Sequence, residues 1–126
     1  QTSFMPTLLK EQFKHTDFYS NMKSVYLIHS INNYRKYSKS TYDMLGITPN
    51  ESGKLVDNHI MAIENSDLTI AINYESSQLL DKMKKQKKLF ETFESNNSMV
   101  IDIPKKTNRT VWQETSNIIE SACRKL

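Results

Sequence analysis

The spacing of apolar residues around position 70 constrains the fold of this chain more than any other feature. Leu68, Ile70, Ile72 and Tyr74 recur at every second position, with β-branched residues between and beside them. A period of two indicates a β-strand rather than a helix. Two shorter apolar runs have the composition of buried strands, and turn residues and Pro104 bound the second of them. The predicted strands are residues 24–28, 66–74 and 99–103.

The stretches between these strands carry apolar residues at helical spacing. The predicted helices are residues 31–45, 54–65, 76–94 and 109–125. Alternation of this kind predicts an α/β fold, a flavodoxin-like three-layer sandwich with a small parallel sheet. Residues 1–21 stand outside the alternation, so we expect an N-terminal helical extension over residues 1–21 and an α/β domain over residues 22–126.

Composition excludes several classes of function. With only Gly46 and Gly53, neither of the common glycine-rich phosphate-binding motifs can be written. No apolar stretch reaches the ~20 residues of a membrane span. The net charge of +3 is too small to favour nucleic-acid binding, and we interpret the lysine-rich run at 82–88 as a solvated helix end. The single Cys123 fits a reducing compartment, so we expect a cytoplasmic protein with a buried thiol there.

Polar residues follow the predicted strands at their carboxyl ends, which is where open parallel sheets bind ligands. We predict a ligand pocket from His29, Ser30, Ser76 and Ser77. Each has a plainer interpretation, because a histidine at a strand end often makes local hydrogen bonds and a serine before a helix often caps it. No residues stand at the spacing of metal ligands, and no metal is expected.

Several segments, taken in order, resemble the TIR (Toll/interleukin-1 receptor) domain family. Residues 24–30 are similar to its opening strand, residues 62–66 to its A-I-x-x-S helix and residues 68–77 to the strand that runs into N-Y-x-x-S. Residues 99–104 and Trp112 match its last strand and closing helix. The resemblance implies a signalling or defence module that acts through a homo-oligomer or another TIR-like domain. It also implies an interaction loop formed by Pro49, Asn50, Glu51, Ser52, Gly53 and Lys54.

The chain departs from that family where its NAD-cleaving members carry a catalytic glutamate. Met83 stands at this position, and a thioether cannot replace a carboxylate. The nearest carboxylates are Glu75 and Asp81. We therefore expect a contact module without a cofactor. The alternative is an enzyme that processes an N-glycosidic bond, as NAD glycohydrolases and deoxyribosyltransferases do. NAD or a nucleotide would be its ligand, and Glu75 or Asp81 its catalytic carboxylate.

Overall fold

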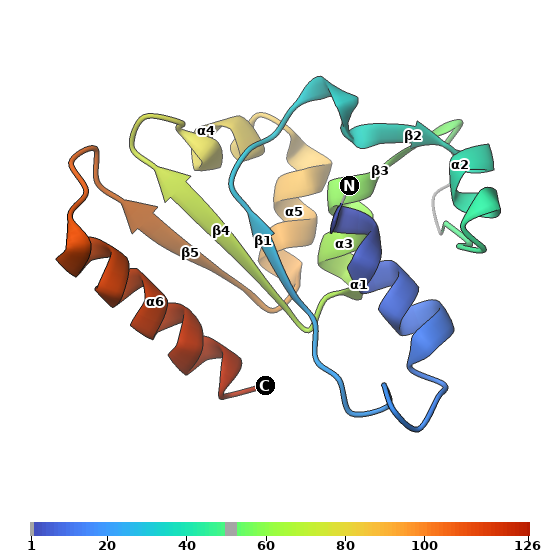
Figure 1. Ribbon diagram of the computed structural model, residues 1–126. Helices are drawn as coiled ribbons and strands as arrows, with labels where there is room; N and C mark the ends of the chain where they lie inside the picture. The colour runs from blue at the N-terminus through green and yellow to red at the C-terminus, as the bar shows by residue number, and fades with distance from the viewer. Residues whose placement is uncertain (1, 50–52) are drawn as a thin grey trace.

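Three parallel strands form the central sheet, in the order β1-β4-β5 (Figure 1). They are β1 (Val25–Ile28), β4 (Leu68–Tyr74) and β5 (Ser98–Ile103). The computed structural model describes residues 2–49 and 53–126. All three strands lie where the sequence predicts them, which confirms a mixed α/β fold of the flavodoxin-like class.

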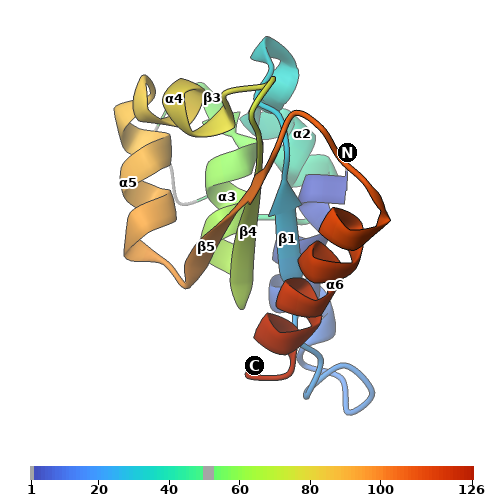
Figure 2. The same cartoon turned by 90° about the vertical axis from the view of Figure 1, so that its left-hand side faces the viewer.

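The sheet is covered on both faces, as the nearly continuous apolar sequence of β4 requires. Ile70 and Ile72 pack against one helix, α6 (Arg109–Cys123), together with residues of β5. Ala71 points to the opposite face, where α3 (Asn58–Asn65) and α5 (Lys87–Ser95) supply the second core. Figure 2 shows the three layers, with α6 on one side of the sheet and α3, α4 and α5 on the other.

The prediction of one helix over residues 31–45 is wrong. The segment forms a short 3-10 helix η3 (Asn33–Arg35), a strand β2 (Lys36–Ser38) and a helix α2 (Lys39–Met44). β2 pairs antiparallel with β3 (Leu55–Asp57), a strand inside the predicted helix 54–65. Pairing between distant segments leaves no trace in the local period, which is why both strands were missed.

The predicted helix 76–94 is two helices, α4 (Leu79–Lys84) and α5, separated at Lys85 and Gln86. Leu79, Met83, Leu89 and Phe93 are all buried in one core. The step of six residues from Met83 to Leu89 does not fit a continuous helix with 3.6 residues per turn, so the break restores the phase. Met83 is thus a core residue.

The N-terminal segment is helical, as predicted. It consists of η1 (Thr2–Phe4), α1 (Met5–Leu8) and a π-helical turn η2 (Leu9–Phe13), and α1 packs against α3. Gln12 donates to the carbonyl oxygens of Leu45 (2.6 Å) and Gly46 (3.2 Å). Gly46 has φ +66° and ends α2 in a Schellman turn, in which the Ile47 N–H bonds the Tyr42 carbonyl at 3.0 Å. Gly46 is therefore the C-terminal cap of α2.

The expectation of a buried thiol is wrong, because Cys123 is exposed at the end of α6. Among the described residues, no helix combines the length and the apolar character needed to cross a membrane. The division at residue 21 into an extension and a domain stays a prediction.

Candidate functional site

The carboxyl ends of the three strands meet at one edge of the sheet because the strands are parallel. β1 ends opposite Ala71, whereas β4 continues alongside β5 until Tyr74 pairs with Ile103. The chain after β4 turns into α4 on one face, and the chain after β5 turns into α6 on the other (Figure 2). Adjacent strands whose connections leave toward opposite faces open a crevice between their ends, where sheets of this class bind ligands.

A hollow of about 380 Å³ occupies this crevice, lined by Asn73, Glu75, Asp102, Ile103 and Pro104. Asn73 donates to the Asp102 carboxylate at 2.6 Å and accepts from the Leu80 N–H at 3.3 Å. The Glu75 carboxylate accepts from the Lys105 N–H at 2.9 Å. The wall of the crevice therefore combines three polar side chains, which these hydrogen bonds hold in place, with the apolar Ile103 and Pro104, as is usual for ligand sites.

The structure brings most of the predicted pocket residues to this edge. His29 and Ser30 are exposed directly after β1, and Glu75 lines the hollow itself. Ser76 and Ser77 form the turn before α4, but neither is its N-cap. That position belongs to Gln78, which has a left-handed φ of 49°, while the Ser77 hydroxyl donates to the Tyr74 carbonyl at 3.1 Å. The capping interpretation of these serines is wrong.

The remaining predicted residues lie apart from the crevice or add no fixed contact there. Asp81 is exposed in the first turn of α4. Pro49, Gly53 and Lys54 lie between α2 and β3, away from the ends of β4 and β5 (Figure 1). Asn50, Glu51 and Ser52 lie outside the described residues. Across residues 2–49 and 53–126, no group of three potential ligands is placed to hold a metal ion.

A buried polar network that no sequence pattern predicts lies beneath η3. Arg35 donates to the Asp57 carboxylate at 2.7 Å, to the Asn32 carbonyl at 2.9 Å and to the side chain of Gln86. Asp57 also caps α3 by accepting from the His59 N–H at 3.0 Å. The network ties β3 and α3 to the break between α4 and α5. It acts on the fold, since its charges are satisfied internally.

His59 extends the network. Its Nδ1 shares a hydrogen bond of 2.5 Å with the Tyr26 hydroxyl. Burial lowers the pKa of His59, with Arg35 adding to the effect and Asp57 opposing it. Burial also raises the pKa of Tyr26. Both groups are therefore neutral near pH 7.

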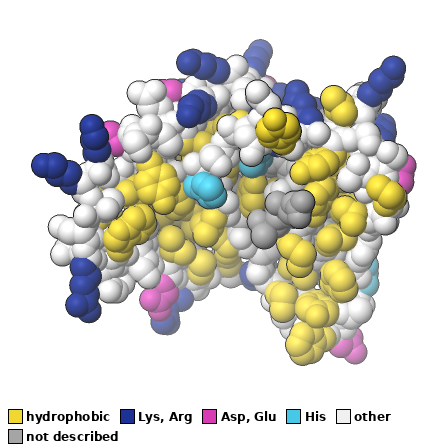
Figure 3. All heavy atoms as spheres, turned by 45° about the horizontal axis from the view of Figure 1, so that its top comes forward, with side chains coloured by type: hydrophobic (Ala, Val, Ile, Leu, Met, Phe, Trp, Pro, Cys, Tyr) yellow, Lys and Arg dark blue, Asp and Glu magenta, His cyan; other side chains and the backbone are white. Residues whose placement is uncertain are grey.

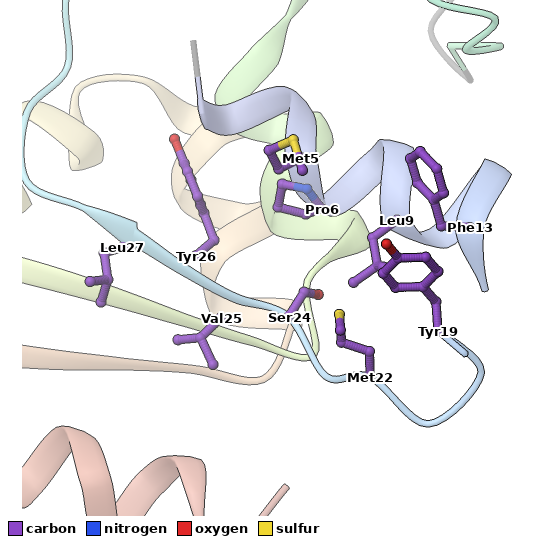
Figure 4. Close-up of a pocket in the computed structure, with 10 residues that line it drawn as sticks. All are labelled: Met5, Pro6, Leu9, Phe13, Tyr19, Met22, Ser24, Val25, Tyr26 and Leu27. Carbon is purple, nitrogen blue, oxygen red and sulfur yellow. The ribbon is translucent and has the colours of Figure 1, made fainter. Parts of the chain in front are cut away.

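Another hollow is an apolar groove of about 520 Å³ between the N-terminal helices and β1. In Figure 4 the side chains of Val25 and Leu27 point to one face of the sheet and that of Tyr26 to the other. Exposed hydrophobic residues continue beside it, and Figure 3 shows such side chains gathered over the N-terminal part of the molecule. The groove lacks the fixed polar groups of the crevice, so the crevice is the better candidate for chemistry.

Comparison with known proteins identifies one family. The family model described as the starch synthase catalytic domain matches residues 1–94. No curated protein and no solved structure matches significantly. This match overturns the TIR resemblance and the signalling and defence role taken from it. It equally contradicts the alternative of NAD or nucleoside N-glycosidic bond processing, so the roles of the 49–54 loop in TIR contacts and of NAD as substrate lose their support.

Proposed function

The chain belongs to the family of starch synthase catalytic domains, and from this premise we propose that it takes part in glycosyl transfer. The family name implies that a glucosyl unit passes from an activated donor to a growing glucan. In such a transfer the bond between the anomeric carbon and the donor's leaving group breaks. A bond to an acceptor hydroxyl oxygen forms, and the hydroxyl proton is released.

One observation carries the proposal: the family match includes β4, whose end forms one wall of the crevice, and the neighbouring strand β1, while β5 lies beyond residue 94. Residues 1–94 include β1 with His29 and Ser30, and β4 with Glu75, Ser76 and Ser77. A sugar offers several hydroxyl groups, which pair well with imidazole, hydroxyl and carboxylate side chains. We assign the binding of the transferred sugar to these five residues.

The chain after β5 supplies positive charge near the crevice. Lys105 and Lys106 are exposed beyond the crevice, and the Lys105 backbone is held there by Glu75. Ammonium groups stabilise the negative charge that develops on a diphosphate leaving group. The arrangement thus suits a sugar nucleoside diphosphate as donor, bound with its sugar toward Glu75 and its phosphates toward the lysines.

Calorimetric titration with ADP-, GDP- and UDP-glucose tests the proposal. We expect one of the three to bind, and we expect His29→Ala and Ser30→Ala to weaken that binding by about tenfold each, the usual effect of losing a hydrogen bond to a charged or polar ligand. His15→Ala is the matched control, because His15 is equally exposed but lies in the N-terminal turn. If none of the three donors binds, or if the His15 variant is affected as much as the His29 variant, the proposal is wrong.

A further inference from the structure

The start of α6 places an exposed aromatic ring at the edge of the sheet that holds the crevice. The Trp112 side chain belongs to a residue that is 45% exposed, although indole is among the most costly surfaces to leave in water. Its ring lies 6.4 Å from that of Tyr74, centroid to centroid, with the planes tilted by 57°. Tyr74 follows Asn73 in β4, so its side chain points to the α6 face, whereas Asn73 lines the crevice and contacts α4. The aromatic pair therefore lies at the carboxyl edge of the sheet, on its α6 face.

The core and the hydrogen bonds at the start of α6 hold Tyr74 and Trp112 in place. Tyr74 packs against the core between the sheet and α6, and Asn108 fixes the start of the helix by accepting from the Val111 N–H at 2.9 Å. The next turn is anchored by the Thr115 side chain, which is buried and donates to the Val111 carbonyl at 2.8 Å. Trp112 thus projects from a rigid element rather than from a loop, which favours binding with little loss of conformational entropy.

The neighbours of Trp112 on the outer surface of α6 are polar. Arg109 precedes it by one turn, Gln113 follows it directly and Ser116 follows it by one turn, and all three are exposed. A helix that lies in a membrane surface, or one that fills a hydrophobic groove, presents apolar residues at these spacings. A single ring surrounded by hydrogen-bonding side chains matches neither pattern.

This arrangement matches the surface of a pyranose ring. One face of such a ring exposes C–H bonds, which stack against the negative face of an aromatic ring, while the hydroxyl groups around its rim seek hydrogen bonds. Trp112 provides the flat surface and the polar side chains around it provide donors and acceptors.

We propose that Trp112, supported by Tyr74, is a stacking platform for a linear α-linked glucan, the acceptor chain of the transfer. The assignment of the glucan rests on the proposed function, whereas the platform rests on the geometry of α6 and β4. Trp112 lies beyond residues 1–94, so the family match does not reach it. The acceptor would approach along α6 and reach the crevice across the carboxyl ends of β4 and β5.

Trp112 is the only tryptophan of the chain, which makes its fluorescence a direct reporter. We expect maltoheptaose to change the emission of Trp112 saturably. Calorimetry on Trp112→Ala should show binding weakened by about tenfold or more, as is typical of a tryptophan at the centre of a binding surface. Ile118→Ala is the matched control, because Ile118 lies on the other flank of the same helix and is 44% exposed. It should bind maltoheptaose as the unaltered chain does.

Different experimental outcomes refute the stacking platform and the proposed transfer. If maltoheptaose leaves the emission unchanged, or if Trp112→Ala binds it undiminished, the platform is refuted, even when a sugar nucleotide binds at the crevice. If maltoheptaose binds through Trp112 but no sugar nucleotide binds, the platform stands and the transfer is refuted. An emission change with dodecylphosphocholine micelles and none with maltoheptaose would assign the ring to a lipid surface and overturn the inference.

Discussion

The ion pair of Arg35 and Asp57 provides a sharp test of how the fold is held together. The two side chains are 11% and 7% exposed, and the Nε–Oδ2 distance is 2.7 Å. Breaking a buried pair by removing one partner costs about 3–5 kcal/mol, because the other charge stays buried without compensation. Asp57 also caps α3, a contact worth about 1 kcal/mol. We expect Asp57→Ala to lower the free energy of unfolding by ~4 kcal/mol, a large share of the 5–15 kcal/mol of a typical domain.

Two variants separate the charge from the cap. Asp57→Asn keeps an oxygen that can accept from the His59 N–H but removes the charge opposite Arg35. It should therefore be about 1 kcal/mol more stable than Asp57→Ala. The control is Glu120→Ala, which removes an ion pair with Arg124 of similar length, 2.6 Å, whose side chains are 59% and 77% exposed. We expect that variant to lose under ~0.5 kcal/mol, since exposed pairs contribute little.

Urea unfolding followed by far-UV circular dichroism measures all three variants against the unaltered chain. A loss below ~1 kcal/mol for Asp57→Ala would refute the argument, because it would mean that the network carries no net stability. Equal losses for Asp57→Ala and Glu120→Ala would do the same, since burial would then not distinguish the pairs.

Three further predictions follow from the structure. Gly46→Ala should lower stability by about 1–2 kcal/mol, because φ is +66° and a Cβ would come within 2.7 Å of the Gln12 amide; urea unfolding that gives no loss contradicts this. Stability should decrease as pH falls below about 6.5, since burial lowers the pKa of His59 and the unfolded chain binds the proton first; His59→Gln should remove this slope. Burial opposes ionisation of Asp67, but the Ser24 N–H with Lys14 and Lys23 lowers its pKa overall, so Asp67→Asn should flatten the further loss of stability below about pH 4.

The sequence predicted the parallel sheet because its strands are defined locally. β4 is buried on both faces, so its side chains had to be apolar throughout, and turn residues mark the limits of β5. The strands β2 and β3 escaped prediction for the opposite reason. Each has three residues, and each becomes a strand only through pairing with the other across the helix α2. No period of apolar residues can arise in so short a segment.

The residues of the candidate site also divide into those that local sequence predicts and those that depend on contacts between distant segments. The carboxyl ends of the strands follow from the order of elements, so the sequence alone places His29, Ser30 and Glu75 at one edge of the sheet. The side-chain contacts that join Arg35 to Asp57 and Gln86, and His59 to Tyr26, could not be predicted, since they connect residues 22 to 51 positions apart. The step of six residues between the buried Met83 and Leu89 is a local signal that the helix breaks near Gln86, whose side chain accepts from Arg35.

The failure of the TIR resemblance has a physical cause in the same residues. The matched segments are dominated by side chains that the structure buries, among them Ala62, Ile63 and Ile70 at 0% exposure. Any chain that packs a helix on a parallel sheet requires small and β-branched residues at such positions, whatever ligand it binds. The chain departs from the TIR pattern at Met83, which the structure buries in the core where the catalytic glutamate of that family would face a ligand. Agreement at buried positions therefore identified an architecture, and it carried no information about the ligand or the chemistry.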